Sequence, residues 1–109
     1  MTAMLFLLQR ASAAVLVVAV AVHLATIVYA VRGGLTAGEI LERTQGSGVY
    51  LAFYLVFVTA VAVHAPIGLR NVVREWMGWK GRACDAALAV FALALFALGA
   101  RAVMALYLA

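Results

Sequence analysis

Three long apolar stretches alternate with short polar connectors along the chain. Each stretch is long enough for one helix across a bilayer, since about 20 apolar residues as helix span about 30 Å of hydrocarbon. The connectors between them contain most of the glycines and most of the charges. The pattern predicts an all-α integral membrane protein, a three-helix bundle built as a single domain over residues 1–109. The predicted spans are residues 11–31, 49–69 and 83–107.

Composition supports the same interpretation. Hydrophobic residues make up 69% of the chain and charged residues 11%, against about 45–50% and about 25% in soluble domains. Too few polar side chains exist to cover a water-soluble fold. The net charge of +4 comes from 4 acidic residues against 8 basic ones, with no basic patch, so nucleic-acid binding is not indicated. The single cysteine, Cys84, forms no disulfide framework and no CxxC metal motif.

Charge also predicts the orientation of the helices. With three spans, the N-terminus and the second connector lie on one side of the membrane. Basic residues favour the cytoplasmic side, so we expect a multi-pass protein of the cell inner membrane with a cytoplasmic N-terminus. The predicted cytoplasmic side carries Arg10, Arg70, Arg74, Lys80 and Arg82, and the other side carries Arg32 and Arg43 beside Glu39 and Glu42.

The chain has 2 histidines, His23 and His64, and both fall inside predicted spans. Ionisable residues in a membrane are costly and by default mark function, although a neutral histidine donating to a backbone carbonyl is the simpler alternative. The spans lack the four ligands of a structural zinc site and the carboxylates of a proton relay. Haem b needs only one or two imidazoles and a flat apolar slot. Ala60, His64 and Gly68 follow one helix face, which favours haem and makes His64 and His23 the candidate metal ligands.

The two histidines are predicted to lie at different depths. His64 is about 9 Å along the helix from Arg70, and His23 is about 20 Å from Arg10. The levels differ by about 10 Å, so the two side chains should not ligate the same iron. Either each binds a different haem, with the second ligand from another chain, or only His64 is a ligand.

The segment from His64 to Arg70 has the form H-x-x-x-G-x-R, and Glu75 follows the histidine by eleven positions. Residues 10–13 read Arg-Ala-Ser-Ala, similar to an Arg-x-Ser-Gly signature at the first helix. Together these motifs resemble the cytochrome b membrane-anchor subunit of succinate dehydrogenases, in the succinate/fumarate:quinone oxidoreductase family. Gln9 stands where many members have a histidine.

The resemblance implies a non-catalytic electron-transfer subunit that holds haem b and passes electrons to or from quinone. It would anchor flavoprotein and iron–sulfur subunits at the cytoplasmic face, where Trp76 and Trp79 provide a docking surface or an interfacial aromatic belt. In dihaem members a first-helix histidine binds a second haem, which His23 would match. A second small anchor subunit, or a second copy of this chain, would then supply the missing ligands.

The resemblance also implies roles for individual residues. The expected cofactor-binding residues are His64, His23, Gly68, Arg70 and Arg101. The expected quinone-binding residues are Arg10, Ser12 and Glu75. For Arg10 and Glu75 the alternative is a solvated charge at a helix end. For Arg101 it is a side chain that extends to the outer membrane surface.

Two other functions fit the sequence. One is a haem-free structural anchor that lends a quinone pocket, since a histidine alone does not reveal its ligand. The other is a small homo-oligomeric channel or transporter subunit, with the histidines as gating groups. A channel would require polar residues along a stripe that faces the pore. Besides the histidines, the polar residues in the spans are only Thr26, Thr59 and Tyr54.

Overall fold

The computed structural model describes residues 2–109, and every regular element in that range is helical. Three elements are long and apolar enough to cross a membrane: α1, α4, and the continuous helix formed by α3 and η1. The predicted fold class, an all-α multi-pass membrane bundle, is therefore confirmed. The elements are α1 (Ala3–Gly33), α2 (Ala37–Thr44), α3 (Gly48–Val72), the π-helical η1 (Val73–Met77) and α4 (Arg82–Tyr107).

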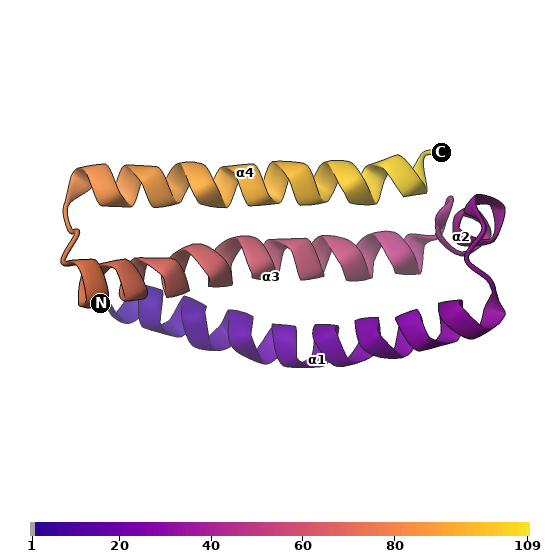
Figure 1. Cartoon of the computed structure of the whole chain (residues 1–109), viewed down its shortest axis with the longest axis horizontal. Helices are drawn as coiled ribbons and strands as arrows, with labels where there is room; N and C mark the ends of the chain where they lie inside the picture. Colours follow the sequence, from indigo (N-terminus) through magenta and orange to yellow (C-terminus); the bar gives the residue numbers. More distant parts are fainter. Residues whose placement is uncertain (1) are drawn as a thin grey trace.

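Helix α3 is the centre of the bundle. It packs against α1 on one side and α4 on the other, and both neighbours run antiparallel to it (Figure 1). The N-terminus lies beside η1 at one end of the molecule, here called the η1 end. Helix α2 and the C-terminus lie at the opposite end, here called the α2 end. A side chain that contacts both α1 and α4 must therefore belong to α3.

Side-chain caps begin three of the helices. The Thr2 hydroxyl accepts a hydrogen bond from the Leu5 amide at the start of α1, and Ser47 caps α3 in the same way. At α2 the Thr36 hydroxyl accepts from the Glu39 amide and donates to the Glu39 carboxylate, which satisfies one of the amides that the first turn leaves free. Gly34, with φ 120°, ends α1, in a conformation that residues with a Cβ rarely adopt.

Helix α1 begins at Ala3, well before the predicted span that starts at residue 11. Its first turns contain residues with good helix propensity, and the Thr2 cap satisfies the end. As a result Arg10 lies more than a turn inside the helix rather than at its boundary. The level of Arg10 relative to α3 therefore differs from the one expected from the sequence.

The first connector contains a short helix that the apolar pattern did not predict. Helix α2 contacts both α3 and α4. The Gly46 amide, just after α2, donates a hydrogen bond to the Tyr107 carbonyl at the end of α4, at 2.9 Å. The connector is thus fixed to the bundle at the α2 end.

Small side chains dominate the helix contacts. Among the buried residues are Ala19, Ala60 and Ala62, which allow the backbones to approach closely. One close approach lies between α3 and α4. A Cβ placed on Gly99 would stand 2.6 Å from one methyl carbon of Val58 and 2.9 Å from the other. Because valine has little rotamer freedom in a helix, Val58 cannot move aside without moving α3.

We expect Gly99→Ala to lower the free energy of unfolding by about 1–3 kcal/mol, the usual cost of overpacking. Titration of the chain with sodium dodecyl sulfate, followed by circular dichroism, measures the effect. Gly48→Ala is the matched control, because nothing lies within 4 Å of that position. Val58→Ala should restore stability to the Gly99→Ala variant; no rescue would contradict the close approach.

Candidate functional site

Two polar contacts join α1 to α3 within the predicted spans. The Ser12 Oγ lies 3.4 Å from the His64 Nδ1, and the His23 Nδ1 lies 2.9 Å from the Tyr54 hydroxyl oxygen. Ser12 is buried, and both histidines are half-buried. Each histidine thus pairs with a hydroxyl of the neighbouring helix, not with a backbone carbonyl.

These contacts determine the relative depth of the histidines. His64 is level with Ser12, and residues 12 to 23 span about 16 Å of helix. Residues 54 to 64 on α3 span about 15 Å. The two histidines therefore differ in depth by about 15 Å, more than the ~10 Å expected from the arginines. That expectation took Arg10 as the end of the helix, whereas α1 begins at Ala3. The two imidazoles are too far apart to meet at one iron.

Hydrogen bonding around Ser12 favours one tautomer of His64. The Ser12 hydroxyl donates to the Gln9 carbonyl at 3.1 Å, a common bond for serine within a helix. A hydroxyl has one proton, so the Ser12 oxygen can only accept from His64. An Nδ1–H···Oγ bond would place the His64 proton on Nδ1 and leave Nε2 with its lone pair free, the form of imidazole that binds a metal.

Gln9 lies beside this pair; in the sequence only its departure from the expected histidine distinguished it. Its Nε2 would lie 3.4 Å from a Cβ at Gly68, so the amide packs against the glycine. Its Oε1 is buried and has no hydrogen-bond partner among residues 2–109. A buried acceptor without a donor costs about 1–3 kcal/mol.

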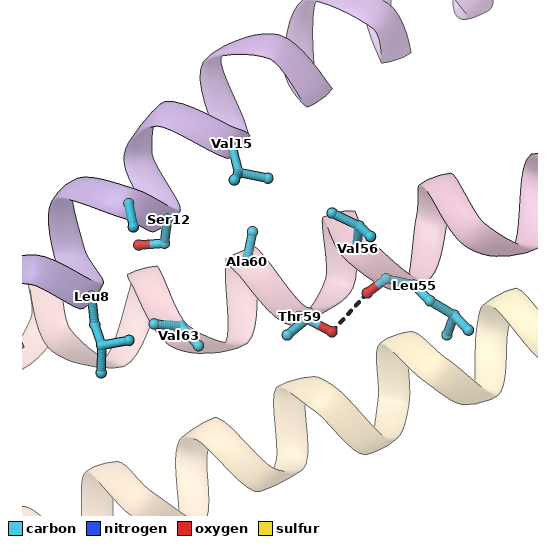
Figure 2. A pocket seen from close by; sticks show the side chains of 9 residues that line it. Leu8, Ser12, Val15, Leu55, Val56, Thr59, Ala60 and Val63 are labelled. Atoms are coloured by element: carbon cyan, nitrogen blue, oxygen red, sulfur yellow. Dashed lines mark hydrogen bonds between the residues drawn. The ribbon is translucent and has the colours of Figure 1, made fainter.

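A groove of about 370 Å³ runs between α1 and α3 next to Ser12. Figure 2 shows Ser12 and Val15 of α1 pointing toward Ala60 of α3 across it. The hydroxyl of Thr59, also on its wall, donates to the Leu55 carbonyl of its own helix. The groove therefore presents an almost entirely apolar surface close to His64, of a size found among ligand pockets.

A second cavity, of about 560 Å³, contains His23 on its wall. The imidazole meets the rings of Tyr54 and Phe57 edge-on, at centroid distances of 5.5 Å and 5.4 Å. Residues of α4, among them Gly99, form the opposite wall. We call this space the His23 cavity.

Comparison with known proteins gives one match. A family model described as the succinate dehydrogenase/fumarate reductase transmembrane subunit matches residues 1–101, nearly the whole chain. The chain belongs to this family. Searches of curated proteins and of solved structures found no significant match. The resemblance inferred from the motifs is thereby confirmed at the level of the family.

Within this transmembrane subunit, the H-x-x-x-G-x-R motif divides between two interfaces. His64 and Gly68 face α1, where they meet Ser12 and Gln9. Arg70 instead turns toward α4, and its Nε donates to the Asp85 carboxylate at 3.1 Å. The two side chains border a cavity of about 510 Å³ near the η1 end.

The other candidate residues are dispersed. The Arg10 guanidinium lies over the Phe6 ring, 5.7 Å from its centre, and is exposed. Glu75 is exposed on η1, beside a different cavity from the one at Ser12. Arg101 is exposed, about half a turn around α4 from the residues that contact α3. Arg10, Ser12 and Glu75 therefore share no cavity, and Arg101 faces away from this chain's histidines.

We expect His64 to have its proton on Nδ1 in the cofactor-free chain. The ¹⁵N spectrum of chain labelled only in histidine, at about pH 8 where an ordinary imidazole is neutral, reports the tautomer, and His23→Ala assigns the signals. Ser12→Ala should shift His64 toward a tautomer mixture. Thr59→Ala, which removes a hydroxyl bonded within its own helix, should have no effect; an equal change in both variants would contradict the assignment.

Proposed function

We propose that this subunit binds haem b through His64 and carries electrons between an iron–sulfur partner and quinone. The observation that supports the proposal best is the Gln9–Ser12–His64 chain of hydrogen bonds. In this chain Ser12 donates to the Gln9 carbonyl and its oxygen lies 3.4 Å from the His64 Nδ1, an arrangement that would hold the imidazole by Nδ1 and leave Nε2 unprotonated. Outer partners of this kind orient metal-binding histidines in general.

The surroundings of His64 fit a macrocycle better than a bare metal ion. Among residues 2–109 no three His, Cys, Asp or Glu side chains cluster, whereas haem needs only one or two axial ligands from protein. Gly68 and Ala60 add little bulk beside His64, and the Ser12 groove is apolar. The Gln9 amide would hold a polar group at the edge of the cofactor. Bound haem would supply a one-electron carrier within the membrane.

A second haem on His23 is the alternative stoichiometry. Its other ligand would come from a second small anchor subunit or a second copy of this chain, and Arg101 could then pair with a propionate between subunits. Haem content per chain distinguishes the two.

Quinone is proposed to bind near the η1 end. Arg10, Ser12 and Glu75 are the residues implied by the family motifs. Of these, Ser12 is already bonded to His64. We propose that Arg70, held by Asp85 beside the cavity of about 510 Å³, adds a donor for a quinone carbonyl, which gains negative charge on reduction.

The same end is the proposed docking surface for the flavoprotein and iron–sulfur subunits. Trp76 is 83% exposed and Trp79 44%, and Arg74 and Lys80 lie close by. Interface cores are enriched in aromatic residues and arginine. By the positive-inside rule this face is cytoplasmic, which would place the protein in the cell inner membrane.

One observation counts against a channel. The hydroxyls of Thr26 and Thr59 donate to the carbonyls of Val22 and Leu55 in their own helices. Their hydroxyl protons are therefore not free to donate into a pore. A haem-free anchor with a quinone pocket remains the competing function, and a spectrum separates it from the cytochrome.

We expect the purified complex to show a b-type signal in the reduced-minus-oxidised visible spectrum, with about one haem per copy of this chain. His64→Ala should abolish the signal because the iron loses its ligand from this chain. Thr59→Ala is the matched control in the adjoining groove and should retain it. An unchanged spectrum in His64→Ala would refute the assignment, and a complex intact without haem would establish the structural anchor.

We expect Gln9→Leu to raise the free energy of unfolding of the cofactor-free chain by about 1–2 kcal/mol, because it removes a buried acceptor without a donor. The same variant should retain less haem on detergent washing. Gln45→Leu, at an exposed position, should change neither quantity. If Gln9→Leu destabilises the cofactor-free chain, the amide has another partner and the role is refuted.

A further inference from the structure

The cavity of about 510 Å³ near the η1 end has one charged pair in its wall. The Arg70 Nε on α3 donates to the Asp85 Oδ1 on α4 at 3.1 Å. The other wall residues of these two helices are apolar, and α1 adds Thr2 and Leu5. We call this space the Arg70 cavity. Its ionisable chemistry therefore belongs to the ion pair.

The ion pair lies at one end of the Arg70 cavity. Because α3 and α4 are antiparallel, Arg70 and Asp85 meet at the η1 end. Along α4 the wall continues from Asp85 through Leu88 to Ala92, about 10 Å of helix. A ring bound beside Arg70 would thus have an apolar path for its tail.

Asp85 is the only acidic side chain in this wall among residues 2–109. The chain has 4 acidic residues. Glu39 and Glu42 belong to α2, at the opposite end of the molecule (Figure 1). Glu75, the acid of the family motif, borders a separate cavity of about 310 Å³. The motif acid and the Arg70 cavity are therefore apart, and a different acid stands in the cavity wall.

Asp85 connects the Arg70 cavity with the molecular surface. It belongs to the first turn of α4, and its side chain is 57% exposed, against 18% for Arg70. Its Oδ1 accepts from Arg70, whereas its Oδ2 has no hydrogen-bond partner among residues 2–109. One carboxylate oxygen is thus fixed, and the other is open to water at the η1 end.

Reduction of a quinone carbonyl requires a proton as well as electrons. A guanidinium keeps its protons in proteins, so Arg70 can stabilise the reduced oxygen but cannot protonate it. Arg70 has five N–H donors, and one of them bonds to Asp85, which leaves donors for a carbonyl. A carboxyl group beside the same guanidinium can give and take a proton.

We propose that Asp85 is the proton-transfer residue for a quinone bound in the Arg70 cavity. The quinone rests on the proposed function. As electrons from the iron–sulfur partner reach the carbonyl, the Arg70 guanidinium turns toward that oxygen, and the Asp85 carboxylate takes up a proton from water. Asp85 then gives this proton to the oxygen, and an O–H bond forms. The second oxygen takes its proton from water, and the iron–sulfur partner supplies both electrons.

The neighbours of Asp85 offer no second proton donor of this kind. Arg70 faces it from α3, and α1 contributes the uncharged Thr2 and Leu5 to the cavity. On α4 itself, Arg82 precedes Asp85 by three residues. Removal of the Asp85 carboxyl should therefore leave the cavity without an acid of its own.

The test uses the purified complex, with decylubiquinone as the electron acceptor. Asp85→Asn keeps an oxygen for Arg70 but removes the acid. We expect kcat for quinone reduction to fall about 10- to 100-fold with KM near wild type, because water replaces part of the contribution of a general acid. Reduction of a water-soluble dye by the flavoprotein should not change. An unchanged kcat with quinone would overturn the proposal.

The pH profile and added acids separate proton transfer from a structural role. The kcat of Asp85→Asn should fall more steeply than that of wild type as the pH rises, since hydronium then supplies the proton. Acetate buffer should restore part of this kcat, and Asp85→Glu should retain most of it. A lowered kcat that acetate does not raise and that has the wild-type pH profile would make Asp85 only a structural partner of Arg70.

Binding separates this proposal from the proposed quinone site. The full chain in detergent micelles has 2 tryptophans, and quenching of their fluorescence measures decylubiquinone binding. Asp85→Asn should bind as wild type, whereas Ala89→Phe, which fills the cavity from an exposed position, should lose saturable binding. Unchanged binding in Ala89→Phe would refute the quinone site itself. Lost binding there, with normal turnover in Asp85→Asn, would refute the proton role alone.

Other acids of the chain provide the comparison. Glu42→Gln is the matched control, an exposed acid of α2, and should keep wild-type turnover in the complex. A larger loss of kcat in Glu75→Gln than in Asp85→Asn would assign the proton transfer to the motif acid and overturn the proposal.

Discussion

The arrangement of this subunit depends on two polar pairs between α1 and α3. Ser12 with His64, and His23 with Tyr54, are the side-chain hydrogen bonds that cross this interface. In lipid, apolar surfaces give little preference for one register over another, because lipid tails are as apolar as the helices. Sliding α1 by one turn would separate both pairs; Ser12 would keep its bond to the Gln9 carbonyl, but His64, His23 and Tyr54 would lose their partners across the interface. The pairs therefore determine the depth of each histidine and, with it, the chemistry available at each level.

The two pairs differ in the bonding of the hydroxyl. Both histidines contact, through Nδ1, a hydroxyl of the neighbouring helix. Ser12 also donates to the Gln9 carbonyl of its own helix, so its proton is directed away from His64. The Tyr54 hydroxyl has no partner besides the His23 Nδ1 among residues 2–109. Ser12 thus reaches His64 with a hydroxyl fixed to its own helix, whereas the Tyr54 hydroxyl is fixed only by the imidazole.

Much of this could be predicted from the sequence, because hydropathy over 20 residues is a strong signal. The all-α class and the presence of three helices able to cross a membrane were predicted correctly, and the motifs pointed to the family. Helix α1 extends before the predicted span, because an apolar count does not consider the Thr2 cap. Thr36 caps α2, but the helix is too short for its periodicity to reveal it from the sequence. The Tyr54 partner of His23 and the orphaned Gln9 oxygen depend on tertiary register, which no local pattern specifies.

The central place of α3 has a consequence for how the chain is made. Helix α1 leaves the ribosome first, and its main packing surface, α3, is not synthesised until later. During that interval the imidazole of His23 lies in or near the bilayer without Tyr54. Helix α1 therefore gains its tertiary contacts only when the hairpin with α3 closes, while α3 and α4 can pair as soon as both have inserted. Helix α1 therefore packs into the membrane domain only after α3 has been inserted.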